Sequence, residues 1–201
     1  MTASLNRAQL LNRGVKGGAA LLVAGGTFAQ LAETASADAL PVMDLAYARL
    51  LVGAELLASD FYSQAIAASN TTAVVTRYLK KAYLNEQEHY QSVAGIISGS
   101  LNTPAVSADI TFSYPSGTFD SQASILKLAE SLEATILGAY LGAIGSIQTN
   151  SFKTGLAQIA ACEAQHAAYF STMTGGKAFS VSFPPALTID KASNALDAFT
   201  A

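Results

Sequence analysis

Apolar residues recur at helical spacing in five stretches of the chain, separated by polar breaks. The predicted helices cover residues 41–69, 72–97, 120–144, 152–174 and 188–199. In the first four, residues three and four apart form an apolar stripe, as in helices that bury one face. Helix-ending signals follow three of them, at residues 70–72, at Gly99 and at Gly175-Gly176. The pattern predicts an all-α fold.

The lengths of the connections predict how these helices are arranged. Only a few residues separate the first helix from the second and the third from the fourth, so each pair should be antiparallel neighbours. Residues 98–119 are rich in Ser, Thr, Pro and Gly, with a strand-like patch at 110–114, and are long enough to run the length of a bundle. We therefore expect a four-helix bundle of the ferritin-like type, with one long crossover between parallel second and third helices and a short C-terminal helix.

Polar residues interrupt the apolar stripes in a pattern that repeats between the two halves of the chain. They are Glu55, Glu86, His89, Glu133, Glu163 and His166. Each half has a lone glutamate followed by a Glu-x-x-His motif, 31 residues later in the first half (55 to 86) and 30 later in the second (133 to 163). Residues three apart share a helical face, so each motif directs a carboxylate and an imidazole to one point.

The electrostatics of this arrangement favour bound metal. A carboxylate buried without a partner costs several kcal/mol, so four that converge require compensating positive charge. Two divalent cations balance four carboxylates and leave one histidine nitrogen for each metal. The sequence has two histidines, and the pattern uses both. We therefore expect a two-metal site built from these six residues.

Other residues near the pattern receive different expectations. Tyr62 and Tyr140 each lie seven residues after a lone glutamate, where core packing is the default and a hydrogen bond to a ligand carboxylate is the alternative. Glu130 is expected to form an ion pair or to face solvent, and Glu88, on the far side of its helix from Glu86, to be solvated. Cys162 is expected to be a small buried hydrophobic residue.

Composition restricts the classes of function. The length of 201 residues suits one domain, which we place at residues 40–201. A net charge of -3 and eleven scattered Lys and Arg residues argue against a nucleic-acid partner. A single cysteine excludes an internal disulfide and a CxxC motif. Because 51% of the residues are hydrophobic and 12% are charged, the surface should favour association, and we expect a homo-oligomer or a larger assembly.

The N-terminus resembles an export signal. Arg7, Arg13 and Lys16 precede an apolar run over residues 17–32, followed by small-residue cleavage patterns at 35–39. The run is shorter than the roughly 20 residues needed to cross a bilayer, which makes a permanent anchor the weaker interpretation. We therefore expect residues 1–39 to direct export to the periplasm or the exterior of a bacterial cell, with membrane contact only if this segment is not removed.

Five segments resemble the exported bacterial ferritin-like domains related to plant desiccation-related proteins. They are ELLASDFY (55–62), EQEH (86–89), LEATILGAYL (132–141), EAQHAA (163–168) and FPPALT (183–188). The resemblance covers residues 41–200. It implies that Glu86 and Glu163 bridge two metals while Glu55 and Glu133 each cap one. Members often carry a further glutamate one turn after the first, where this chain has Ala58.

Metal pairs of this kind handle dioxygen or peroxide, so the favoured function is that of a di-iron oxidase, ferroxidase or peroxide-reducing protein. Manganese suits the same ligands, which keeps a manganese catalase-like enzyme as an alternative. Bulk iron storage is disfavoured, because the helices have few acidic residues outside the site. A rubrerythrin-type relay is disfavoured, because it needs four cysteines. A third possibility is a structural or stress-protection bundle that metal stabilises without turnover.

Overall fold

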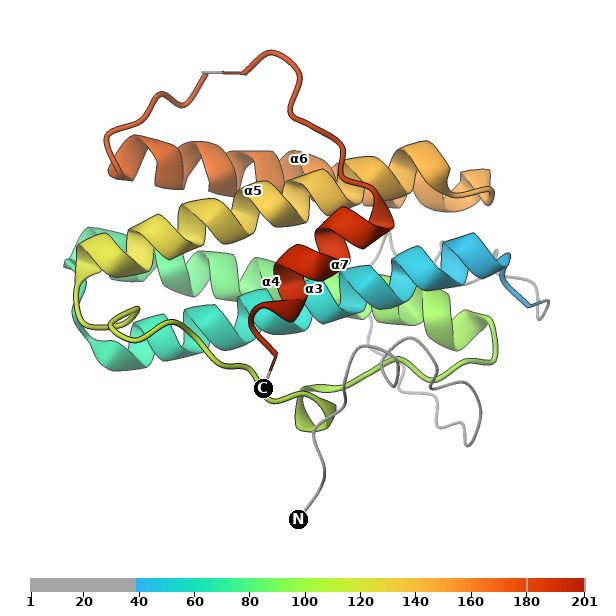
Figure 1. The fold of residues 1–201 in the computed structure, drawn as a ribbon, viewed down its shortest axis with the longest axis horizontal. Coiled ribbons are helices and arrows are strands. Elements are labelled where there is room, and N and C mark those ends of the chain that lie inside the picture. Colours follow the sequence, from blue (N-terminus) through green and yellow to red (C-terminus); the bar gives the residue numbers. More distant parts are fainter. Residues whose placement is uncertain (1–38, 180, 201) are drawn as a thin grey trace.

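The computed structural model describes residues 39–179 and 181–200, and their regular structure is helical (Figure 1). The helices are α3 (Val42–Ala68), α4 (Ala73–Gly99), α5 (Gln122–Ser146), α6 (Asn150–Met173) and the shorter α7 (Ile189–Asp197), with a 3-10 turn η1 at Ser107–Asp109. Each predicted helix is present, and the ends differ from the predicted ones by at most two residues. The periodicity of apolar residues therefore located all five.

Side-chain caps explain where two of the long helices begin. At the start of α4, the Thr72 hydroxyl accepts a hydrogen bond from the backbone N–H of Val75 at 3.5 Å. The third helix was predicted to begin at Asp120, but Ser121 is the cap of α5, and its hydroxyl accepts a hydrogen bond from the Ser124 N–H at 3.1 Å. The Ser124 hydroxyl oxygen in turn accepts a hydrogen bond from the Ser121 N–H at 3.2 Å, so the two residues cap the helix reciprocally.

The helices form a bundle with one long crossover. α3 and α4 make one antiparallel hairpin, α5 and α6 make another, and α4 and α5 run in the same direction (Figure 1). The segment between α4 and α5 runs back along the outside of the bundle. The strand-like patch at 110–114 forms a single antiparallel bridge, between Phe112 and Thr200. The predicted ferritin-like topology is confirmed.

A buried carboxylate joins the two hairpins at one end of the bundle. Asp44, in the first turn of α3, is only 2% exposed. Its two oxygens accept hydrogen bonds from the backbone N–H groups of Gln148 and Thr149, each at 2.8 Å. These groups precede α6, where backbone donors have no partner within the helix. Asp44 thus fixes the start of the first hairpin against the turn of the second.

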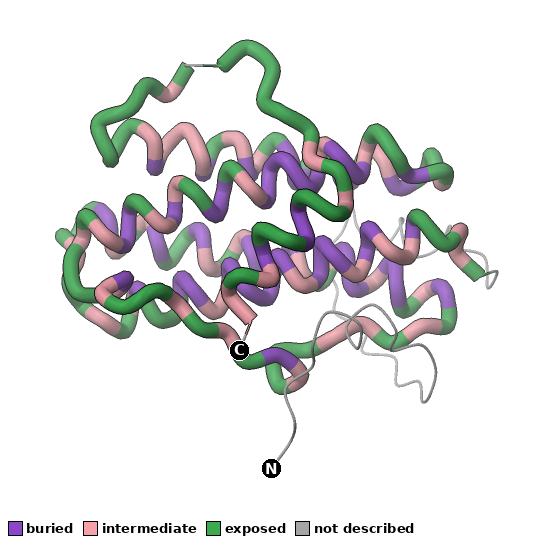
Figure 2. Tube along the Cα trace, in the orientation of Figure 1, coloured by how far each residue is buried: buried purple, intermediate pink, exposed green. Residues whose placement is uncertain are grey.

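The C-terminal segment covers one side of the bundle. Buried positions lie along the inward faces of the helices, and α7 packs across α3 and α5 (Figure 2). Just before α7, the Leu187 N–H donates to the Gly138 carbonyl oxygen at 2.8 Å. A Cβ atom on Gly142 would lie 1.8 Å from the Leu187 carbonyl oxygen. Glycine at 142 is therefore required for the backbone before α7 to reach α5.

The expected export segment falls almost entirely outside the part of the chain that the structure describes. Only Ala39 of residues 1–39 is included. Among the described helices, none combines the length and the apolar character needed to cross a bilayer.

Candidate metal centre

The six predicted ligand residues lie together in the middle of the bundle. α3 supplies Glu55, α4 supplies Glu86 and His89, α5 supplies Glu133, and α6 supplies Glu163 and His166. The four glutamates are at most 1% exposed, and the two histidines are 8% and 3% exposed. Apolar side chains surround them, so the stripes that drive helix packing also carry these polar groups into the core. That these residues bind metal stays a prediction.

Their potential ligand atoms form two overlapping groups. Glu55, His89, Glu86 and Glu163 make the first group, and the second joins Glu86 and Glu163 to Glu133 and His166. Within each group, one atom per residue lies within 4.8 Å of all the others. Glu86 and Glu163 belong to both groups, in keeping with the bridging role that the resemblance implies. The remaining residues divide evenly, one carboxylate and one imidazole to each group.

Both histidines turn the same ring nitrogen toward the centre. The Nδ1 atom of His89 lies 2.7 Å from Glu163 Oε1 and 3.1 Å from Glu86 Oε2. The Nδ1 atom of His166 lies 3.0 Å from Glu86 Oε1 and 3.5 Å from Glu133 Oε1. The opposite nitrogens, Nε2, therefore face out of the cluster. Each imidazole can offer the Nδ1 lone pair to a metal while Nε2 makes a separate contact.

Unsatisfied polar atoms provide a test of whether a metal fits. Within the described residues, seven buried side-chain nitrogen or oxygen atoms have no hydrogen-bond partner, and six of them belong to this cluster. The six are Glu55 Oε2, Glu86 Oε1, Glu133 Oε2, both oxygens of Glu163, and His166 Nδ1. Each such atom costs about 1–3 kcal/mol unless something coordinates it. Carboxylate oxygens and an imidazole nitrogen are the donors that divalent transition metals take, so the residues fit a metal pair.

Protons compensate for part of the charge when no metal is bound. Burial, followed by the negative charge of Glu163, raises the pKa of both Glu55 and Glu133 well above 4.5. These two carboxyls therefore tend to be neutral acids. In Glu163 itself burial opposes ionisation, but the adjacent imidazoles of His166 and His89 outweigh it and lower its pKa to about 2. The carboxylate shared by both groups stays ionised.

The histidines hold protons strongly for the same reason. Burial lowers the pKa of His89, but the neighbouring Cys162 and Glu163 side chains outweigh it and raise this pKa to about 12. The pKa of His166 is likewise raised against burial, by Cys162 and Glu133. A metal ion would displace these protons, so binding should release them to solvent.

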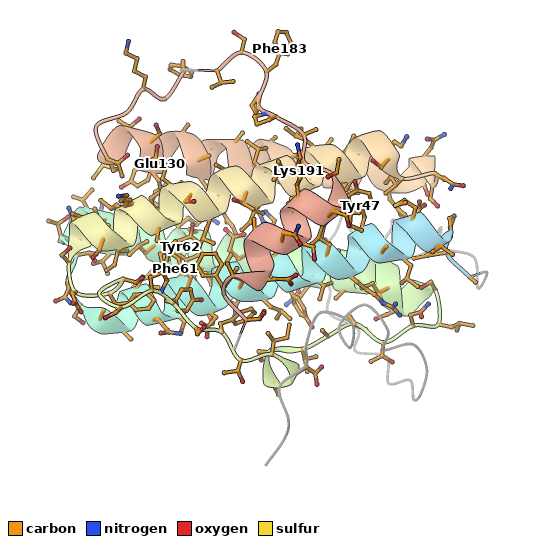
Figure 3. The ribbon with its side chains drawn as sticks, viewed as in Figure 1. Tyr47, Phe61, Tyr62, Glu130, Phe183 and Lys191 are labelled. Carbon is orange, nitrogen blue, oxygen red and sulfur yellow. The ribbon has the colours of Figure 1, made fainter. Side chains whose placement is uncertain are left out.

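Two tyrosines link the halves of the cluster. Tyr62 on α3 lies between α3 and α5 and donates a hydrogen bond to Glu133 Oε1 (Figure 3). Tyr140 on α5 donates in return to Glu55 Oε1. Both are at most 1% exposed. The alternative expectation for these tyrosines is therefore correct, and each one bonds the glutamate of the opposite hairpin.

The sequence-based expectation for Cys162 is wrong. Its side chain is half-buried, and Sγ lies 3.7 Å from His166 Nε2 and 3.4 Å from the amide nitrogen of Asn85. Burial raises the pKa of the thiol, but hydrogen bonds with His166 and His89 outweigh it and bring the pKa to about 7. Asn85 and Cys162 each directly precede the glutamate of a Glu-x-x-His motif. That shared position, next to a motif glutamate, is the sequence feature that could have indicated that Cys162 lies beside a histidine of the cluster.

The remaining candidate residues lie away from the cluster. Glu130 lies near the C-terminal end of α6, where its Oε2 accepts a hydrogen bond from the Thr174 hydroxyl at 2.6 Å (Figure 3). Glu130 is half-buried and its partner is a neutral hydroxyl, so that expectation was incomplete. Glu88 is exposed, as predicted. Ala58 is buried, so α3 brings a single carboxylate, Glu55, to the cluster.

Comparison with known proteins agrees with this geometry. The family model described as a ferritin-like domain matches residues 43–176, which include the four long helices apart from Val42, and all six clustered residues. The match ends before the segment that carries α7. The comparison with curated proteins gave no match.

Proposed function

Because this chain belongs to the ferritin-like domain family, we propose that it binds two iron ions and uses them to react with dioxygen or peroxide. The carrying observation is the set of six buried ligand atoms without hydrogen-bond partners, arranged in two groups that share two glutamates. In this proposal Glu55 and His89 would hold one metal, Glu133 and His166 would hold the other, and Glu86 and Glu163 would be shared by both.

Charge balance supports two divalent ions rather than one. Four ionised glutamates carry four negative charges, and two divalent ions would cancel them once the histidines lose their extra protons to bind metal. A single ion would leave two negative charges at a buried position, which protons on the glutamates or histidines would have to balance. When bound, a metal pair of this kind supplies two electrons to a small molecule in one site.

The protein's own groups define the remaining chemistry. Tyr62 and Tyr140 hold one oxygen of Glu133 and Glu55, respectively, leaving the other oxygen of each without a hydrogen-bond partner. The closely packed side containing α3, α5 and α7 excludes water. The His89 side chain retains 11% exposure, against 0% for Glu55 and Glu86. We propose that small molecules and protons reach the site from the histidine side.

The test begins with the metal content of purified protein and of protein reconstituted with Fe(II) or with Mn(II). We expect about two ions per chain. Oxygen uptake with Fe(II), and peroxide consumption with either metal, should then be compared with those of the Glu86→Gln variant and the exposed Glu88→Gln control. Loss in the first variant alone supports the proposal. Peroxide disproportionation with Mn(II) only would favour a manganese catalase-like enzyme.

A different result would favour the structural alternative. If two metals bind and raise the melting temperature, but neither dioxygen nor peroxide is consumed, the metals stabilise the bundle without turnover. If no metal binds, the proposed function is wrong. Export through residues 1–39 and homo-oligomer formation remain part of the proposal, and cell fractionation and sedimentation would test them separately.

A further inference from the structure

The outward face of His166 meets a pair of side chains that the proposed metal site does not use. The Nε2 atom of His166 lies 3.1 Å from the amide nitrogen position of Asn85 and 3.7 Å from Cys162 Sγ. Asn85 and Cys162 contact each other at 3.4 Å. One small polar cluster therefore touches the His166 imidazole from the side opposite the glutamates.

This pair occupies equivalent positions in the internal repeat. Asn85 lies four residues before His89, and Cys162 lies four residues before His166. Residues four apart are neighbours on one helical face, so both motifs place a side chain beside the outer edge of an imidazole. The two helices bring these side chains together, so the cluster depends on both motifs.

The contacts of Asn85 and Cys162 affect metal binding through the position of the proton on the imidazole. A neutral imidazole carries one proton, and a metal can bind only the nitrogen that lacks it. If Nδ1 is to face the metals with a free lone pair, Nε2 must carry the proton and needs an acceptor. His166 Nδ1 is buried, directed into the cluster and without a hydrogen-bond partner. A sulfur atom accepts from Nε2–H, and so does the carbonyl oxygen that the Asn85 amide presents after a half-turn about its Cβ–Cγ axis.

We propose that Asn85 and Cys162 are positioning residues that keep the proton of His166 on Nε2, so that its Nδ1 atom remains directed at the metals. Both side chains lie against the Nε2 edge of this one ring. The inference rests on the proposed metal site and adds two outer hydrogen-bond partners for one of its histidines. It gives the cysteine a function without any redox change of sulfur.

The experiment compares metal affinity in matched variants of the full chain, measured by chelator competition with Mn(II) and with Zn(II). Removing an outer hydrogen-bond partner of a ligand histidine weakens metal binding about 10–100-fold, so Cys162→Ala and Asn85→Ala should each lose affinity in this range. Cys162→Ser keeps an acceptor and should recover most of the loss. Asn85→Asp provides an acceptor in either orientation and should bind at least as well as the unaltered protein. Gln165→Ala, an exposed change on α6, is the control.

A nitrogen-15 NMR measurement on the Zn(II)-loaded protein separates positioning from simple packing. The unaltered protein should show metal-bound Nδ1 and protonated Nε2 in His166, with slow exchange of the Nε2 proton. In Cys162→Ala the His166 Nε2 proton should exchange faster while the melting temperature of the metal-free protein stays unchanged. Rescue by serine together with this exchange pattern supports the inference.

Two outcomes would overturn it. If the unaltered protein binds metal and both alanine variants bind equally well, Asn85 and Cys162 have no positioning role and the proposed function stands. If the loaded His166 binds metal through Nε2, the assignment of its ring nitrogens is wrong. If the unaltered protein binds no metal at all, both the proposed function and this inference fail, and that result is distinguishable from the other two.

Discussion

The two sides of the metal cluster differ in how completely they are closed. On the side of α3 and α5, Tyr62 and Tyr140 are fully buried and α7 packs over the helices. On the side of α4 and α6, Asn85 and Cys162 are half-buried and His89 retains some exposure. The closed side fixes the carboxylates by hydrogen bonds, and the partly open side carries the groups that exchange protons. The cluster is therefore closed on the side of α3 and α5 and partly accessible on the side of α4 and α6.

Aromatic rings narrow the accessible side at one end. Tyr78 on α4 and Tyr169 on α6 stack with ring centroids 3.4 Å apart, and Tyr78 meets His166 edge to face at 6.0 Å. Burial raises the pKa of Tyr78 to about 12, so its hydroxyl stays protonated. The Tyr169 hydroxyl is the one buried atom without a partner that lies outside the cluster, within the described residues.

The largest expected effects come from replacing a cluster carboxylate on each side, Glu163 on α6 and Glu133 on α5. Glu163→Gln and Glu133→Gln should each lower metal affinity by about 100-fold or more, since each removes a proposed ligand. Their effects on the metal-free protein should have opposite signs. The pKa of Glu133 is raised, so glutamine should stabilise the fold. The pKa of Glu163 is lowered to about 2 by its histidine contacts, so glutamine should destabilise it. Thermal melts in chelator measure this difference.

If both glutamine variants shifted the metal-free melting temperature in the same direction, the two sides would not differ electrostatically. Glu88→Gln provides the control, because its side chain is exposed on α4.

A second prediction concerns packing on the closed side. Gly142→Ala should lower the free energy of unfolding by about 1–3 kcal/mol, because the new methyl group meets a backbone oxygen that cannot turn away. Gly95→Ala on α4 has open space around the added methyl group and should raise stability by about 0.5–1 kcal/mol. Urea unfolding of the metal-free proteins compares the two changes. If Gly142→Ala left the free energy of unfolding unchanged, the segment before α7 would not be held against α5.

The third prediction tests whether the halves are equivalent on the closed side. Tyr62→Phe and Tyr140→Phe each remove one hydrogen bond to a ligand glutamate. Each should destabilise the fold by about 1 kcal/mol and weaken metal binding about 10-fold. The affinity should be measured by chelator competition. Very different losses in the two variants would indicate that the two metal positions are not equivalent.

The smallest expected effect is a gradual change in the stability of the metal-free protein with pH. Glu55 and Glu133 have folded pKa values raised above 4.5, and His89 has one raised from 6.5 to about 12. Above about pH 4.5 the metal-free folded state therefore binds more protons than the unfolded chain, and its stability should fall as pH rises toward 12. Glu163 acts in the opposite sense only as pH falls from 4.5 toward 2.

Metal binding requires the deprotonated ligands, so the stabilisation by metal should grow with pH. The melting-temperature difference between loaded and chelator-treated protein should be larger at about pH 8 than at about pH 6. A difference that stays constant would mean that binding releases no protons. That outcome would contradict the proton-loaded state of the histidines.

The sequence predicted the helices, the crossover and the convergence of the six residues, because helical period and loop length determine all three. It did not predict which glutamate each tyrosine bonds. Tyr62 shares a helical face with Glu55, yet its partner Glu133 is 71 residues away in sequence. Such a contact depends on the relative height of two hairpins, which no local pattern encodes. The same reason explains Cys162, whose surroundings depend on the spacing of α4 and α6.

The exchange of hydrogen bonds between the hairpins bears on how such a molecule could arise. Each hairpin contributes a glutamate, a Glu-x-x-His motif and a tyrosine whose hydroxyl is used by the other hairpin. A lone hairpin would leave its own glutamate unbonded and its tyrosine unused, whereas two copies related by a twofold axis would satisfy each other. Duplication and fusion of a gene for one self-associating hairpin would give this arrangement directly. The segment between α4 and α5 would then be the join, and Asn85 and Cys162 a position at which the copies have since diverged.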